Sequence, residues 1–147
     1  MYKQLLVPID GSKLSAKATD EAIKLALWLT AGVVFLHVSP AYQPPVVMEG
    51  MIIDYPNESD YRKSVGKQAA AMLEKAAKKA DASDVPCKTV HIIDDSVWET
   101  IISAAKKNKC DAIVMASHGR RGLSAVLLGS ETQKVLTHSK LPVLVVR

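Results

Sequence analysis

The sequence "DAIVMASHGRRGLSAVLLGSETQ", residues 111–133, joins a strand pattern to a helix start through a glycine-rich turn. Its apolar run over 112–117 is continuous rather than alternating, as expected of a strand that is covered on both faces. Gly129 and Ser130 follow the turn, at the start of a helical pattern. A strand, a short turn and a helix in this order form the repeating unit of a parallel α/β sheet.

The rest of the chain repeats this unit. Apolar runs alternate with segments in which apolar residues recur at helical spacing, and "SVWE" and "SETQ" have the form of a capping box at Ser96 and Ser130. Strands that alternate with helices imply right-handed crossovers. We therefore predict an α/β fold of one domain over residues 1–147, an open parallel five-stranded sheet with helices on both faces. The strands are expected over 4–9, 33–38, 87–93, 112–117 and 142–146, and the two longest helices over 12–30 and 59–82.

Three local features extend this prediction. Trp28 lies in a predicted helix and is expected in the core, and the strand over 87–93 alternates more than the others, which favours a place nearer an edge. The one long irregular segment, residues 39–59, is too apolar for a solvated linker. A lid over a pocket, a contact with a partner and packing over the domain's own edge are all open for it.

The composition excludes several classes of protein. With 48% hydrophobic and 23% charged residues among 147, the chain is globular rather than disordered. No apolar stretch approaches the ~20 residues of a membrane-spanning helix, and Pro8 and Asp10 interrupt the start where a signal peptide would be apolar. We expect a cytoplasmic protein. The net charge of +4 is spread over predicted helix faces with few aromatics, which disfavours a nucleic-acid partner, and Cys87 and Cys110 are expected to be reduced thiols.

The glycine-rich turn has the chemistry of a phosphate site. Glycines let the backbone approach a ligand closely, and the free amides at a helix start favour an anion. Arg120 and Arg121 supply positive charge, and the Ser130 hydroxyl can bond a phosphate oxygen or cap its own helix. A plain glycine-rich connection with two surface arginines is equally open from these residues alone. Neither GxxxxGK(S/T) nor GxGxxG after the first strand occurs, which argues against a P-loop ATPase and a dinucleotide-binding domain.

Three segments together resemble the universal stress protein family. They are "IDGS" at 9–12, "LHV" at 36–38 and "ASHGRRGLSAVLLGS" at 116–130, and the likeness runs across essentially the whole chain. The resemblance implies a Rossmann-like sheet of the adenine-nucleotide alpha-hydrolase type and a homodimer formed through the last strand, 142–146. An uncovered terminal strand also invites pairing with a second copy on physical grounds.

The resemblance also implies a nucleotide site. The nucleotide-binding members carry G-x2-G-x9-G-(S/T), of which this chain has Gly119, Gly129 and Ser130, with Ala116 at the first glycine. From the residues alone, Asp10 could equally cap the first helix. The residues expected at the nucleotide are Asp10, Val38, Met115, Ala116, Gly119, Arg120, Gly129 and Ser130.

These features predict a dimeric protein of the stress response that binds ATP or a related adenine nucleotide, ADP or AMP, with Mg²⁺ as an accompanying ion. Efficient phosphoryl transfer needs a metal-holding carboxylate, a positioned nucleophile and a charge clamp, so we expect no more than a slow ATPase. One alternative is a family member without nucleotide binding that acts as a dimeric interaction module, which Ala116 favours. Another is a nucleotidyl-transferring enzyme, because "PIDGSK" at 8–13 weakly resembles the loop that follows the first strand in such enzymes.

Overall fold

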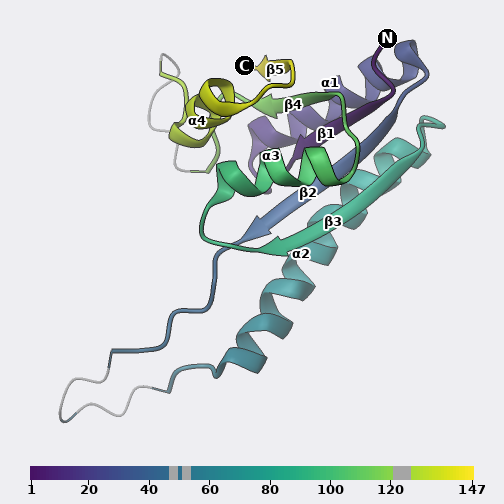
Figure 1. The fold of residues 1–147 in the computed structure, drawn as a ribbon. Coiled ribbons are helices and arrows are strands. Elements are labelled where there is room, and N and C mark those ends of the chain that lie inside the picture. The colour runs from purple at the N-terminus through teal and green to yellow at the C-terminus, as the bar shows by residue number, and fades with distance from the viewer. Residues whose placement is uncertain (47–49, 51–53, 121–126) are drawn as a thin grey trace.

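The chain folds around a parallel five-stranded sheet in which strand β1 is central (Figure 1). The computed structural model describes residues 1–46, 50, 54–120 and 127–147. The strand order is β3-β2-β1-β4-β5, and neighbouring strands pair in parallel. This confirms the predicted open sheet, and β3 lies at an edge, as its alternating pattern indicated. The strands are β1 (Gln4–Pro8), β2 (Gly32–Ser39), β3 (Cys87–Ile93), β4 (Ala112–Ala116) and β5 (Val143–Val146).

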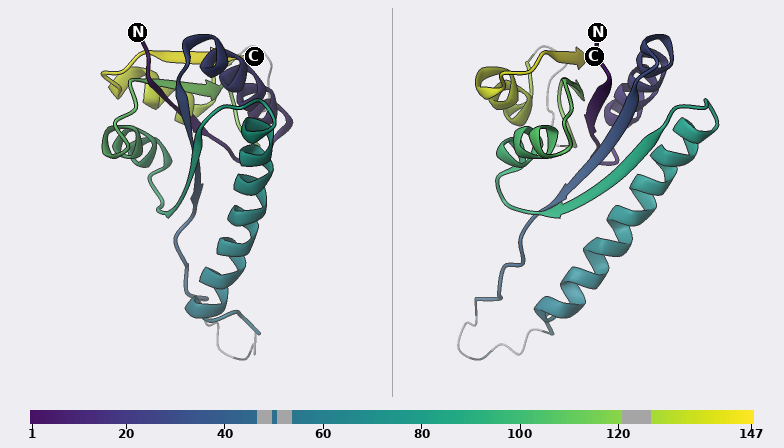
Figure 2. Two further views of the ribbon diagram at one scale, coloured as in Figure 1. Left: turned by 90° about the vertical axis from the view of Figure 1, so that its right-hand side faces the viewer. Right: turned by 45° about the vertical axis from the view of Figure 1, so that its right-hand side comes forward.

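Within the described residues, four helices cover the sheet, two on each face (Figure 2). The chain first steps outward from β1 to β3 and then returns to the other side of β1 for β4 and β5. Because both directions use right-handed crossovers, the first two helices and the last two fall on opposite faces. None of these helices is long and apolar enough to span a membrane. They are α1 (Lys13–Leu29), α2 (Glu58–Asp81), α3 (Val97–Lys107) and α4 (Ser130–His138).

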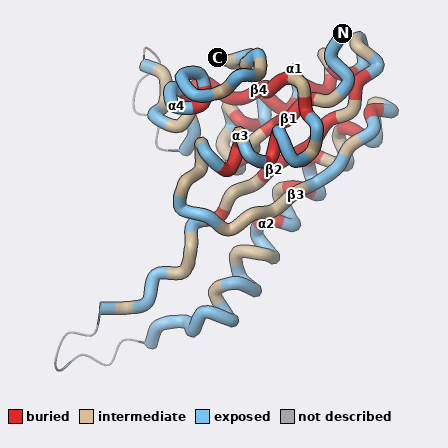
Figure 3. The backbone as a smooth tube through the Cα atoms, in the orientation of Figure 1, coloured by how far each residue is buried: buried red, intermediate tan, exposed pale blue. Residues whose placement is uncertain are grey.

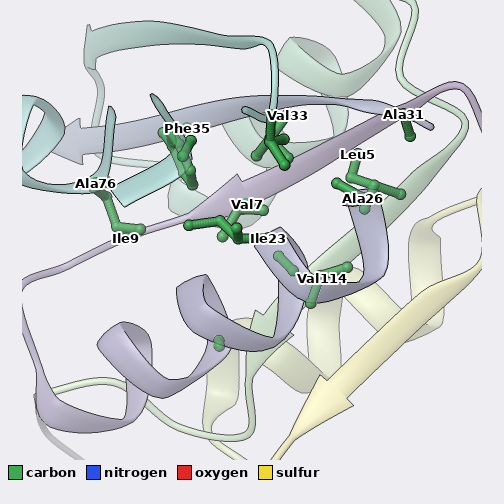
Figure 4. Close-up of a cluster of buried hydrophobic side chains, with 14 of the residues drawn as sticks. Leu5, Val7, Ile9, Ile23, Ala26, Ala31, Val33, Phe35, Ala76 and Val114 are labelled. Atoms are coloured by element: carbon green, nitrogen blue, oxygen red, sulfur yellow. The ribbon is translucent and has the colours of Figure 1, made fainter. Parts of the chain in front are cut away.

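Alternate residues of each strand feed two separate cores. Leu5 and Val7 of β1 pack on the side of α1 and α2 around the fully buried Phe35 (Figure 4), whereas Leu6 packs on the side of α3 and α4. Since both faces of the central strands are covered, these strands are apolar without alternation. Figure 3 shows the buried residues concentrated in the sheet and the helix turns that adjoin it.

The N-terminal half of α2 extends past the ends of β2 and β3, and the chain between β2 and α2 runs out beside it (Figures 1 and 2). The Tyr61 hydroxyl of α2 donates to the Pro40 carbonyl at 2.6 Å, and the Tyr61 ring lies 5.5 Å from the ring of Tyr42. The start of the segment 39–59 is therefore held against α2. The apolar centre of this segment lies outside the described residues.

The structure corrects two local expectations. Trp28 is 84% exposed, because it lies two residues beyond the buried Ala26 and so on the opposite side of α1. The two capping boxes do not form. Ser96 is the N-cap of α3 but its side chain makes no cap hydrogen bond, and Ser130 is the first residue of α4, after the N-cap Gly129.

Candidate functional site

A cavity of about 510 Å³ opens beyond the carboxyl ends of the central strands. It lies where β1 and β4 meet, which is the point at which the winding of the sheet reverses. Ligands of open α/β sheets bind at such switch points, and the volume suits a small molecule. All eight residues predicted for the site line this cavity, namely Asp10, Val38, Met115, Ala116, Gly119, Arg120, Gly129 and Ser130.

The cavity has an apolar side and a polar rim. Leu36, Met115 and Ile101 belong to the core on the α3 and α4 face, and Val38 packs against them. The loops that follow β1, β3 and β4 supply polar groups around this apolar side. A flat aromatic base fits the apolar side of such a cavity, while the rim can bond polar substituents.

Ala116, the departure from the family motif, occupies a regular strand position. It pairs with Val146 across β4 and β5 and is not among the described residues with positive φ. Its methyl group packs in the core cluster on the α1 and α2 face. The backbone here does not require glycine, so alanine fits without strain and the cavity remains open beside it.

The N-terminus of α4 faces the cavity without a side-chain cap. Gly129 is the N-cap, and within the described residues no side chain bonds to it in the manner of a cap. The Gly129 amide donates to the Ser117 carbonyl at 2.7 Å, and the Thr132 hydroxyl donates to the Ala116 carbonyl at 3.0 Å. These bonds tie the helix start to the end of β4. The first-turn amides and the helix dipole favour an anion at this place.

The N-terminus of α3, on the other side of the cavity, is already satisfied by the protein. Glu131 of α4 accepts a hydrogen bond from the Trp98 amide at 2.9 Å through Oε2. Asp94, just before α3, accepts from the Ser96 amide at 2.8 Å. Of these two helix N-termini, only that of α4 has no side-chain partner among the residues that the structure describes.

Asp10 fastens the turn after β1 to the turn after β4. Its Oδ1 accepts from the Ser12 amide at 2.9 Å, and its Oδ2 accepts from the Arg120 amide at 3.0 Å. Ser12 is the N-cap of α1, and its side chain accepts from the Ser15 amide. The alternative that Asp10 caps this helix is therefore wrong. Its carboxylate oxygens still have lone pairs for a ligand hydroxyl.

Two motif glycines, Gly119 and Gly129, lie where other parts of the protein leave little room for a side chain. A Cβ at Gly119 would lie 2.5 Å from Oδ2 of Asp10, and a Cβ at Gly129 would lie 3.0 Å from the Cα of His118. Gly129 has φ −61°, which any residue can adopt. A side chain at position 119 would therefore have to displace the Asp10 carboxylate, and one at position 129 would have to displace the backbone of His118 by a few tenths of an ångström.

The Arg120 guanidinium lies beside the turn after β1. Its Nη2 would be 2.7 Å from a Cβ placed on Gly11, close to the Met72 side chain of α2. Arg120 thus lines the cavity while its charged end is directed toward the α1 and α2 side. Arg121, the second arginine of the motif, lies outside the described residues.

Sequence reasoning missed an acidic part of the rim. Asp94, Asp95 and Glu131 line the cavity together with Asp10. Asp94 and Asp95 directly follow the carboxyl end of β3, the edge of the sheet where ligands bind, so the same rule that singled out Asp10 could have found them.

Comparison with known proteins identifies the family. The sequence profile of the universal stress protein family matches residues 1–147. The chain is similar to the universal stress protein YxiE of Bacillus subtilis, with 35% identity over 149 residues that cover 100% of both chains. Its structure is similar to that of the universal stress protein UspA from Lactobacillus plantarum, with a TM-score of 0.81, 26% identity, and coverage of 99% of this chain and 98% of that chain.

Two structures of lower identity contain ligands. One is a universal stress protein in complex with cAMP, at TM-score 0.72 and 22% identity, covering 99% of this chain and 96% of that chain. The other is the universal stress protein from Archaeoglobus fulgidus in complex with dAMP, at TM-score 0.67 and 17% identity, covering 99% and 98%. At these identities the likeness establishes the fold alone. With the full-length profile match and the similarity to YxiE, this chain belongs to the universal stress protein family.

Proposed function

We propose that this protein binds an adenine nucleotide, ATP or its relatives ADP and AMP, and acts in a stress response as a regulatory protein with little or no turnover. The observation that carries the proposal is the cavity at the β1–β4 switch point, which joins an apolar side to an uncapped helix N-terminus. An adenine ring fits the side formed by Val38 and Met115, and a phosphate fits the amide and hydroxyl of Ser130 at the start of α4. The cAMP and dAMP complexes of similar folds support this choice of ligand.

Mg²⁺ would accompany the nucleotide rather than occupy a site of its own. Among the described residues, no group of three His, Cys, Asp or Glu side chains gathers in a way that could hold a metal ion. At the phosphate end, the backbone amides and the Ser130 hydroxyl suit phosphate oxygens, and the adjoining Glu131 carboxylate is already bonded to the Trp98 amide and paired with Lys134. We propose that the phosphates and water hold the ion.

The test is nucleotide binding to a variant that fills the α4 anion site. Ser130 is exposed at the first position of α4, so Ser130→Glu places a carboxylate where the helix dipole favours it and where a phosphate would otherwise lie. We expect at least a tenfold loss of affinity for adenine nucleotides by isothermal titration calorimetry. Gln133→Glu, on the exposed surface of the same helix turn, is the matched control and should bind like the wild type.

Two results would count against the proposal. Equal binding by Ser130→Glu and Gln133→Glu would show that the phosphate does not lie at α4. Failure of the wild type to bind any adenine nucleotide, with none released from the purified protein on denaturation, would leave the dimeric interaction module as the function. Circular dichroism of each variant establishes that the fold is retained.

The protein is further proposed to act in the cytoplasm as a homodimer paired through residues 142–146. In support, β5 is the edge strand beyond β4, and Leu144 within it is 48% exposed. Sedimentation equilibrium of the wild type should give twice the chain mass. Leu144→Arg should shift it toward the monomer, and a monomeric wild type would refute the pairing.

A further inference from the structure

The rim of the proposed nucleotide site carries an excess of negative charge. Among its described lining residues there are four carboxylates and one guanidinium, which gives a formal charge of −3 with His118 neutral. This is opposite in sign to the net charge of the whole chain, +4. The acidic residues are Asp10, Asp94, Asp95 and Glu131, and the basic residue is Arg120.

The carboxylates are held at the rim by backbone amides. Asp94 accepts from the Ser96 amide at 2.8 Å, Asp95 accepts from the Ala41 amide at 2.9 Å, and Glu131 accepts from an amide of α3. These bonds fix the exposed side chains of Asp94 and Asp95 and the partly buried side chain of Glu131. The negative charges therefore stay beside the cavity instead of turning away into solvent.

Among the described residues, little positive charge is left for a ligand, because the Lys134 ammonium already lies 3.3 Å from Oε1 of Glu131. The uncapped amides at the start of α4 can satisfy one anionic group. The Arg120 guanidinium is directed toward Gly11 and Met72, on the α1 and α2 side. The negative charge of a first phosphate can therefore be stabilised by the amides at the start of α4. Each further phosphate adds negative charge beside carboxylates, which repel it.

We propose that the site selects adenine nucleotides with a single phosphoryl group over free ATP, with Asp94 and Asp95 as specificity-determining residues. This inference rests on the proposed function, because it concerns the same cavity. The expected preference for AMP over metal-free ATP is on the order of tenfold at about 150 mM salt, and it widens at about 10 mM salt, where charges are less screened.

The experiment measures the affinity of the protein for AMP, cyclic AMP, ADP and ATP by isothermal titration calorimetry, in buffer containing EDTA and at both salt concentrations. The test variant is Asp94→Asn/Asp95→Asn, which removes two charges while each side chain keeps the oxygen that accepts its backbone amide. The control is Glu74→Gln/Asp84→Asn, which removes the same charge from exposed sites outside the cavity lining. Asparagine also tolerates the positive φ of 54° at Asp84.

The proposal predicts that the ratio of AMP affinity to ATP affinity falls severalfold in the test variant and stays unchanged in the control. Metal-free ATP that binds as tightly as AMP, or a ratio that the test variant leaves unchanged, overturns the charge selection while nucleotide binding itself stands. Failure of all four ligands to bind overturns the proposed function and this inference with it. The experiment thus distinguishes a loss of charge selection from a loss of nucleotide binding.

Discussion

Replacing Gly119 with alanine should loosen the link between the turns after β1 and β4. The added Cβ would lie 2.5 Å from Oδ2 of Asp10, whereas real Cβ contacts essentially never fall below 3.0 Å. The carboxylate must therefore move by roughly 0.5 Å, which stretches its bond from the Arg120 amide from 3.0 Å to about 3.5 Å, beyond a normal hydrogen bond.

The energetic cost follows from this displacement. A hydrogen bond to a charged group contributes about 1.5–3 kcal/mol, and the lower end applies because Asp10 is partly exposed. Alanine also narrows the unfolded ensemble, which stabilises the protein by about 0.5 kcal/mol. We expect Gly119→Ala to lower the free energy of unfolding by about 1 kcal/mol. In an Asp10→Ala background the clash is absent, so Gly119→Ala should be neutral or slightly stabilising, with a coupling energy of about 1.5 kcal/mol.

Urea unfolding of the four proteins of this double-mutant cycle, at one protein concentration, measures the coupling. The matched glycine control is Gly66→Ala in α2, where no described atom lies within 4 Å of the added Cβ. That change should stabilise the helix by about 1 kcal/mol, the opposite sign. A coupling energy below about 0.3 kcal/mol would refute the reasoning, since the cost of Gly119→Ala would then not pass through Asp10.

Two further predictions concern titratable side chains. Burial, together with the nearby His37, lowers the pKa of His91, so the unfolded chain takes up this proton at a higher pH than the folded protein does. The free energy of unfolding should therefore fall as the pH drops below about 6.5. In urea unfolding of His91→Gln this part of the pH dependence should be absent, and a profile identical to that of the wild type would contradict the prediction. Burial and the neighbouring Asp111 carboxylate raise the pKa of the Cys110 thiol to about 11. Iodoacetamide at about pH 8 should therefore label Cys110 more slowly than the half-buried Cys87, which mass spectrometry can follow. Equal labelling rates in the native protein would contradict this prediction.

Features that depend on neighbouring residues in the chain could be predicted from the sequence. The run of β4 is apolar at every position, and this pattern alone correctly indicated a strand that is covered on both faces. Trp28 was misplaced even though the information was local. At about 100° per residue, Trp28 lies about 200° from the buried Ala26 and so on the outer side of α1. The prediction followed the apolar character of tryptophan instead of this helical spacing.

Features that depend on distant contacts could not be predicted in the same way. The cap of α3 comes from Glu131, which lies 33 residues beyond the Trp98 amide that it accepts from, so the local Ser96 pattern carried no information about it. The bond between Asp10 and Arg120 spans 110 residues. The eight predicted residues nevertheless converge on one cavity, because strand ends and glycine turns are local signals that the sheet topology then brings together.

The central place of β1 has a consequence for how the protein is made. β1 pairs with β2 on one side and with β4 on the other, where Leu5 meets Ala112. As the ribosome extends the chain, β1, β2 and β3 emerge first, so the strand that ends in the middle of the sheet spends most of translation as an unpaired edge. The nascent chain thus exposes the unpaired edge of an apolar strand, which can associate with other chains, until β4 is synthesised.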